Sequence, residues 1–330
     1  MKLPYLLPSV VLAAAFLSGC GSSSTAPNPG TTTSPADEVK AIVADDPSAD
    51  PGGAGYDGSD AILESAPLDF GQSSAPGLAS AATDTCWFRQ LQSTSATLTA
   101  SGDTASMSVT LTRVNSGVLN VGACPTPGQS LFFTKNYTVT WTRAGTYTKG
   151  ATVDPNLGEE NSTAITRWRM VSASLPHTML NAGDPVIDSV QFSKVDGSVS
   201  RTYTDPEALE DPTTWPQLAV GDSVQVKVYT SGPVPVMAFV HFDVSSGVHP
   251  RLQRRRLQYS TLAGAYQGAF VIHHGYFVGR PRGWRVRQAI WVDLVTRATL
   301  RDSGAGYAAS GWGVPYRLQH PSSPSFAFNR

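Results

Sequence analysis

Apolar and polar residues alternate along residues 107–112 and 137–142, so that every second side chain is apolar. A period of two is typical of antiparallel strands that bury one face. A third run places Trp168, Met170 and Ser172 on one face. The tripeptides Asn-Ser-Gly at 115–117 and Arg-Ala-Gly at 143–145 predict turns between the runs. These patterns predict a small antiparallel β unit over residues 86–175.

Strand-like runs also recur through residues 176–318, with Gly or Pro between them. Gly221-Asp222 predicts a turn into the strand at 224–228. About seven short strands with turn signals between them are typical of a β-sandwich. We expect residues 310–318 to form its last edge strand and residues 319–330 to form a tail. The other predicted strands cover 190–192, 199–203, 236–244, 270–272 and 284–294.

The beginning of the chain has a different pattern. Met1-Lys2 precede an apolar run from Tyr5 to Phe16, and small residues follow it. Such a start is typical of an export signal, and the run is too short for a transmembrane helix, which needs about 20 apolar residues. Residues 21–36 hold no large apolar side chain and predict a flexible tether. Within residues 37–85 we expect one short helix at 37–46, with Val39, Ile42 and Val43 on one stripe, and otherwise irregular chain.

The tetrad Leu17-Ser18-Gly19-Cys20 resembles the lipobox of bacterial lipoproteins. The resemblance implies a signal peptide over residues 1–19, an acylated Cys20 at the head of the tether, and a lipid anchor in the cell envelope. Each buried CH₂ of an acyl chain contributes about 0.8 kcal/mol to such anchoring. Gly21 differs from the aspartate that retains enteric lipoproteins in the inner membrane, which indicates the outer membrane. A plain secretory signal is the alternative, but no A-x-A-like cleavage site fits as well.

Two further cysteines, Cys86 and Cys124, remain after Cys20 is assigned to the lipid. The oxidising cell envelope allows disulfides to form. We therefore expect Cys86 and Cys124 to pair, which would close a loop of about 38 residues and stabilise the fold by roughly 3–4 kcal/mol. Two unpaired thiols are the alternative.

The predicted strands of residues 176–318 resemble the immunoglobulin-like modules of bacterial envelope proteins, although the paired core cysteines of antibody domains are missing. The first unit, with a helix ahead of strands that end in the run at 167–174, also resembles the α+β cones of nuclear-transport-factor-like proteins, although it lacks that family's three helices. The expected fold class is mainly β. We expect a small antiparallel β-sheet unit followed by an immunoglobulin-like β-sandwich. The alternative for the first unit is an α+β fold with one short helix.

Charge is distributed unevenly along the chain, although the formal net charge is only −1. Residues 245–330 contain twelve arginines, no lysine and two aspartates, whereas residues 1–244 contain twelve basic and 23 acidic residues. The C-terminal part thus has an excess of ten positive charges. Such a split indicates either an anionic partner for this part or docking between the two halves. Arginines scattered over solvent-facing strand positions are the simpler explanation.

The arginines concentrate in two stretches, residues 249–256 and 280–287. Arginine can bind phosphate and carboxylate groups with two parallel hydrogen bonds. Outside the cytoplasm the candidate anions are lipid headgroups, acidic glycans, envelope phosphates and acidic proteins, and nucleic acid is not expected. The acidic segment at 205–211 could instead pair with these arginines inside the protein. The candidate anion-binding residues are Arg254, Arg255, Arg256, Arg285 and Arg287.

Signals for catalysis are weak. His241 and Asp243 lie two positions apart on a predicted strand, so their side chains leave the same face. With one histidine of the pair at 273–274 they are weak candidates for a Zn²⁺ site, although ordinary hydrogen-bonding histidines are more common. The chain has no G-x-S-x-G nucleophile motif and no phosphate-binding loop. We therefore expect no cofactor and no enzymatic activity.

Three functions are compatible with this sequence. We expect a membrane-anchored envelope lipoprotein that acts as a binding or scaffolding module through an arginine-rich face. A purely structural surface lipoprotein, whose charges pair internally, is the first alternative. An envelope hydrolase or metal-dependent enzyme is the second, and it would need His241, Asp243 and a further histidine to converge on one pocket.

Overall fold

The computed structural model describes residues 34–45, 85–123, 131–152, 165–231, 236–243, 252–272 and 286–319. The predicted lipobox and tether lie outside these ranges, and so do Cys124, Arg285 and the histidine pair at 273–274. Cys86 lies in a strand, but its side chain is not described. The predicted lipid anchor and disulfide therefore stay predictions. Within the described ranges, no helix is both long enough and apolar enough to span a bilayer.

The short helix predicted at 37–46 is confirmed as α1 (Pro35–Asp45). Val39 and Val43 are buried, while Ile42 lies at the margin of the stripe and stays partly exposed. The carboxylate of Glu38 accepts hydrogen bonds from Lys149 Nζ and Trp168 Nε1, both at 2.8 Å. These contacts and the buried valines fix α1 against the strands that carry Lys149 and Trp168.

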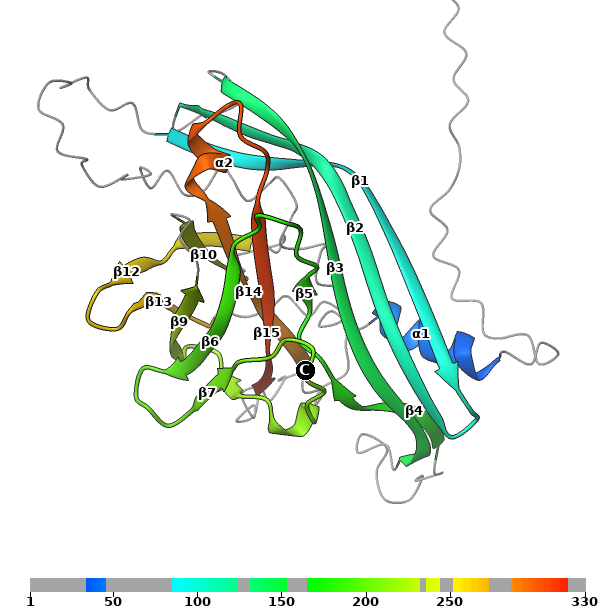
Figure 1. The fold of residues 1–330 in the computed structure, drawn as a ribbon. Coiled ribbons are helices and arrows are strands. Elements are labelled where there is room, and N and C mark those ends of the chain that lie inside the picture. The colour runs from blue at the N-terminus through cyan, green and yellow to red at the C-terminus, as the bar shows by residue number, and fades with distance from the viewer. Residues whose placement is uncertain are drawn as a thin grey trace, which may run out of the picture. The chain divides into compact units, whose positions relative to one another are not determined.

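Four long strands follow in antiparallel order and are drawn in cyan to green in Figure 1. The predicted alternation is confirmed, because Met107, Val109, Tyr137, Val139 and Trp141 are all buried. The strands are β1 (Thr85–Gly102), β2 (Ser106–Ala123), β3 (Leu131–Thr152) and β4 (Ile165–Ala173).

The turns predicted at 115–117 and 143–145 are wrong, because both tripeptides lie inside strands, in β2 and β3. Gly117 instead marks a close approach of two backbones. A Cβ atom at this position would lie 2.1 Å from the carbonyl oxygen of Gln90, next to the β-bulge between Leu91 and Ser93. A glycine in a strand interior often has this role. The actual turn between β1 and β2 is formed by Asp103, whose carboxylate accepts hydrogen bonds from two backbone N–H groups.

The second half of the chain supplies eleven further strands, a short 3₁₀ helix and a short α-helix. Gly221 adopts φ +92° in the turn before β9, as the Gly-Asp pair predicts. The elements are β5 (His177–Thr178), β6 (Val186–Lys194), β7 (Ser200–Tyr203), η3 (Pro212–Thr214), β8 (Gln217–Ala219), β9 (Ser223–Ser231), β10 (Val236–Asp243), β11 (Leu252–Arg256), β12 (Gln258–Ser260), β13 (Ala265–Val271), β14 (Val286–Thr296), α2 (Arg297–Arg301) and β15 (Ala309–Gln319).

These strands form two sheets. The larger sheet has ten strands in the order β1-β2-β3-β5-β15-β14-β10-β11, with β4 paired to β3 and β8 paired to β15. The smaller sheet has five strands in the order β12-β13-β9-β6-β7. The predicted mainly β fold is thus confirmed, with two antiparallel sheets packed on each other. The narrower resemblance to immunoglobulin-like modules stays a prediction.

The last strand, β15, lies in the middle of the larger sheet and not at its edge, contrary to the prediction. It pairs with β14 over ten residues and with β5 at Trp312 and His177. Because β5 also pairs with β3, hydrogen bonding runs from the first predicted unit into the second. Strand pairing within the larger sheet thus joins residues on both sides of position 175, and the predicted domain bounds stay a prediction.

The larger sheet is buried on both faces along β10 and β14. Val240 and Val292 face the smaller sheet and pack with Phe192 and Val226 in one core. Residues of the opposite parity, such as Phe239 and Trp291, form a second core with side chains of β1, β2 and β3. At this core the larger sheet curves so strongly that its two outermost strands, β1 and β11, come into contact. Arg254 of β11 donates a hydrogen bond to the Trp87 carbonyl of β1 at 2.9 Å.

Candidate functional site

A buried ionic cluster lies inside the second core, on three different strands. Arg89 Nη1 of β1 lies 2.7 Å from Asp293 Oδ2 of β14. His241 Nε2 of β10 lies 3.1 Å from the same oxygen. All three side chains are almost completely buried. Asp293 therefore links the first strand of the sheet to two strands that follow about 150–200 positions later in the chain.

Aromatic rings surround the cluster. The Arg254 guanidinium lies 3.7 Å from the ring centroid of Trp87, and the Arg89 guanidinium lies 5.1 Å from it. Phe239 contacts the same indole edge to face, with the ring centroids 5.3 Å apart. Stacking on an indole is the strongest cation–π contact available to an arginine in a protein. Trp87 thus helps to hold two buried guanidinium groups.

The electrostatics keep Asp293 ionised. Burial opposes the charged form, but the charges and hydrogen bonds of Arg89 and His241 outweigh it and lower the pKa of Asp293 far below its ordinary value. A His–Asp pair can act as a general base when the histidine reaches a substrate. Here neither side chain reaches solvent, since His241 and Asp293 are each 1% exposed. In this structure the pair therefore holds strands together and has no access to a substrate.

The lowered pKa of Asp293 predicts a pH dependence of stability. An aspartate in the unfolded chain has a pKa of about 3.9. Because the folded pKa is lower, the contribution of Asp293 is fully present above about pH 4 and is lost as the pH falls toward the folded pKa. We expect the free energy of unfolding to decline more between pH 5 and pH 2.5 in the wild type than in Asp293→Asn. Denaturant titrations across this range measure the difference, and equal declines would assign the acid sensitivity to other carboxylates.

The predicted metal candidates do not come together in the described part of the chain. His241 directs Nε2 to Asp293, and Asp243 ends β10 with a side chain that is not described. The histidines at 273–274 lie outside the described residues. In the ranges that the structure covers, no group of three or more His, Cys, Asp or Glu side chains is placed to hold a metal ion.

The arginines of β11 do not share one face. Adjacent residues on a strand point to opposite sides of the sheet. Arg254 points inward to Trp87 and is buried, whereas Arg255 is exposed and donates a hydrogen bond to the Ala269 carbonyl. Arg287 lies in β14 opposite Arg317, but its side chain is not described. The arginine-rich face that the sequence predicts therefore does not include Arg254.

A different group of arginines comes together at α2. Burial lowers the pKa of Arg301, and the positive charges of Arg297 and Arg256 lower it further. Like charges produce this effect only at short range. We call Arg256, Arg297 and Arg301 the basic cluster. Arg297 and Arg301 stand outside the two arginine-rich stretches, so the sequence pattern does not single them out, although both contribute to the charge excess of residues 245–330.

The position of α2 is fixed by the neighbouring strand β3. Lys135 Nζ donates hydrogen bonds to the Ala298 and Asp302 carbonyls, and the Thr296 side chain caps the helix by accepting from the Thr299 N–H. Burial lowers the pKa of Lys135, an effect that the charge of Asp302 opposes. The helix that carries Arg297 and Arg301 is therefore held at both ends.

The acidic segment at 205–211 finds partners away from the basic cluster. Glu210 lies 2.8 Å from Arg201 Nη2, and Glu207 lies 3.8 Å from His177 Nε2. The Asp211 carboxylate accepts a hydrogen bond from the Thr213 N–H and caps η3. Of the two aspartates within residues 245–330, Asp293 is taken up by Arg89 and His241.

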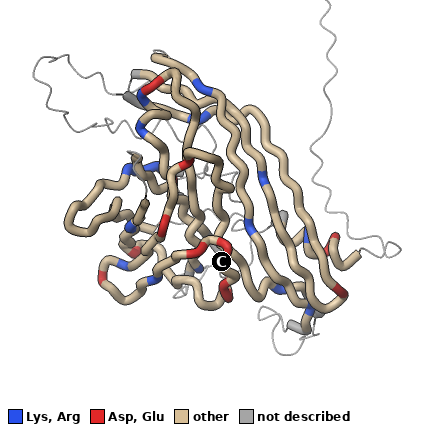
Figure 2. The backbone as a smooth tube through the Cα atoms, viewed as in Figure 1, with Lys and Arg blue, Asp and Glu red and all other residues tan. Residues whose placement is uncertain are grey.

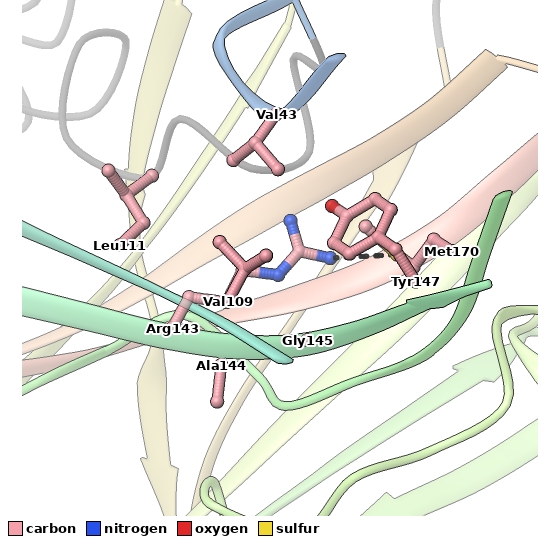
Figure 3. A pocket seen from close by; sticks show the side chains of 8 residues that line it. All are labelled: Val43, Val109, Leu111, Arg143, Ala144, Gly145, Tyr147 and Met170. Atoms are coloured by element: carbon pink, nitrogen blue, oxygen red, sulfur yellow. Dashed lines mark hydrogen bonds between the residues drawn. The ribbon is translucent and has the colours of Figure 1, made fainter. Parts of the chain in front are cut away.

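A small cavity lies beneath α1, and its volume is about 10 Å³, enough for one water molecule. Figure 3 shows the Arg143 guanidinium entering it between apolar side chains. Arg143 Nη2 lies 4.0 Å from the Met170 sulfur. The cavity is too small for an organic ligand. It is lined by Val43, Val109, Leu111, Arg143, Ala144, Gly145, Tyr147 and Met170.

Comparisons of the chain with protein-family models, with curated proteins and with solved structures each gave no match.

Proposed function

We propose that this protein is a lipid-anchored envelope lipoprotein, in the outer membrane, that binds an anionic partner without catalysis. The anchor rests on the lipobox resemblance at Cys20. The observation that carries the binding role is the basic cluster. Arg297 and Arg301 lie four positions apart on α2 and so share one face of the helix, and the charge of Arg256 acts on Arg301. Guanidinium groups gathered in this way attract phosphate and carboxylate groups.

Two sets of carboxylates in the described part of the chain contact groups outside the basic cluster. The acidic segment at 205–211, which was the internal alternative, contacts Arg201, His177 and its own backbone. Asp293, one of two aspartates in the C-terminal part, is buried with Arg89. Figure 2 shows Lys and Arg residues spread over much of the described chain, so a local cluster and not overall charge must account for specificity.

The test is binding of a soluble polyanion by the full chain with Cys20→Ser, which removes the acylated thiol. Fluorescently labelled inorganic polyphosphate is the probe, and anisotropy is measured at 50 and 200 mM salt. We expect Arg301→Ser to weaken binding about two- to fivefold at low salt, because an exposed ion pair contributes up to about 1 kcal/mol. The difference should shrink at the higher salt, since the Debye length falls to about 7 Å.

The matched control is Arg169→Ser, which removes another exposed arginine, on β4, that contributes to the electrostatics of Asp211 and lies outside the basic cluster. Both variants lose one positive charge, so a general effect of net charge would weaken binding equally in the two. Equal losses, or binding that ignores salt, would contradict the proposal and favour a structural lipoprotein. Thermal unfolding of each variant verifies that both are folded.

A further inference from the structure

The hairpin of β12 and β13 ends in an exposed apolar tip. Leu262 is 99% exposed, and Tyr259 is 56% exposed. The tip is a well-defined turn, in which the Ala263 N–H donates to Ser260 Oγ and Gly264 adopts φ +61°. A leucine side chain that is fully exposed to water buries no apolar area and therefore does not stabilise the fold. Its exposure leaves an apolar side chain available for contact with something else.

The hairpin carries no charge along its length. Residues 257–272 contain no Asp, Glu, Lys or Arg. In Figure 1 the hairpin projects from the rest of the described elements, and in Figure 2 it is uncoloured, with basic residues near its base. Such a segment has no charged side chain to desolvate on entering an apolar phase.

The basic cluster adjoins this hairpin through Tyr266. The Tyr266 hydroxyl donates to the Val236 carbonyl of β10 at 2.9 Å, and Val236 pairs with Thr296, the residue before Arg297. Arg256 pairs with Phe239 on the same strand, and the positive charges of Arg297 and Arg256 oppose the rise that burial causes in the pKa of Tyr266. Tyr266 also packs against Tyr259, with the ring centroids 5.1 Å apart. An apolar tip, two tyrosines and a group of arginines therefore follow one another over a short distance.

We infer that the β12–β13 hairpin inserts its tip, led by Leu262, into the surface of an anionic lipid bilayer while the basic cluster contacts the headgroup phosphates. This inference rests on the proposed function and names its partner. Tyrosines at the boundary of water and lipid, with basic residues on the headgroup side, are typical of interfacial membrane contacts. A basic residue near an anionic surface strengthens membrane binding about fivefold. A bilayer is favoured over a protein partner because the tip is narrow and convex, with a single fully exposed leucine.

The test is co-sedimentation of the full chain carrying Cys20→Ser with two kinds of vesicle, pure phosphatidylcholine and phosphatidylcholine with 30% phosphatidylglycerol. The apolar N-terminal run is common to all variants, so binding to neutral vesicles gives the background. We expect Leu262→Ser to weaken binding to anionic vesicles about tenfold, the effect of withdrawing one leucine from an apolar phase. Leu262→Phe should retain binding. The matched control, Val195→Ser, removes a 62% exposed apolar side chain after β6 and should have no effect.

A second measurement tests insertion directly. The tryptophan emission of Leu262→Trp, less that of the wild type, should be quenched by lipids brominated in the acyl chain only when phosphatidylglycerol is present. Equal binding of Leu262→Ser and Val195→Ser, or no such quenching, overturns the inference. If Arg301→Ser still weakens polyphosphate binding in that case, the proposed anion binding stands and the partner is a soluble or protein-borne anion. If neither effect occurs, both proposals fail.

Discussion

Replacing Asp293 with asparagine is expected to lower the free energy of unfolding by about 3–5 kcal/mol. The substitution keeps the size of the side chain but removes the charge that Arg89 and His241 share. Arg89 would then remain as a buried guanidinium without its carboxylate, and burying an uncompensated charge is far more costly than losing one hydrogen bond. Denaturant unfolding at pH 7, followed by tryptophan fluorescence, measures the loss.

Asp196→Asn is the matched control for this substitution. Asp196 is exposed, and its side chain accepts hydrogen bonds from the Ser198 N–H and hydroxyl that an asparagine oxygen can also accept. We expect a change within about 0.5 kcal/mol. The double variant Arg89→Gln with Asp293→Asn should lose less than the sum of the single variants, because the two groups interact directly. Additive losses would show that Asp293 is not coupled to Arg89.

Truncating Trp87 to alanine should lower the free energy of unfolding by about 3–5 kcal/mol. The indole is 1% exposed and contacts Phe239, Arg89 and Arg254. Its removal leaves a large cavity at the place where the outermost strands of the larger sheet meet, and it takes away the ring on which Arg254 stacks. Trp87→Phe should lose less, since a smaller ring stays in place. Thermal and denaturant unfolding of both variants give the comparison.

Phe132→Ala serves as the control for aromatic truncation, because Phe132 is half exposed near the start of β3. Its loss should change stability by about 0.5 kcal/mol or less. A similarly small effect of Trp87→Ala would mean that the two ends of the sheet are held together by contacts other than this indole.

Local pattern predicted most of the strands, because an alternating run has only one way to bury its apolar face. The helix at α1 and the strands around Val109, Val139 and Val226 all follow from such runs. Local pattern gave wrong predictions where a residue type is required by a contact with a residue far away in the sequence. Gly117 is a glycine because of the Gln90 backbone, and not because the chain turns there.

The candidate site was harder to predict, for the same reason. His241 was singled out together with Asp243, whereas its described contact is with Asp293, because the cluster joins three strands that only the folded sheet brings together. Arg254 was expected on a surface and is buried, because the sheet curves until β11 reaches Trp87. Arg297 and Arg301 belong to no arginine-rich stretch of the sequence. They join the basic cluster with Arg256 only in the fold, because both lie on the short helix α2.

The central place of β15 also determines when the protein can fold. A chain that emerges from its N-terminus first has β1 to β4 available early, yet the strand that joins them to β14 is residues 309–319, almost the last to appear. Strands that are far apart in the sequence pair slowly, because the chain loses the entropy of closing a large loop before the strand contacts stabilise it. The larger sheet therefore stays incomplete until β15 is available, and until then the edge of β14 that pairs with β15 is open to pairing with other strands.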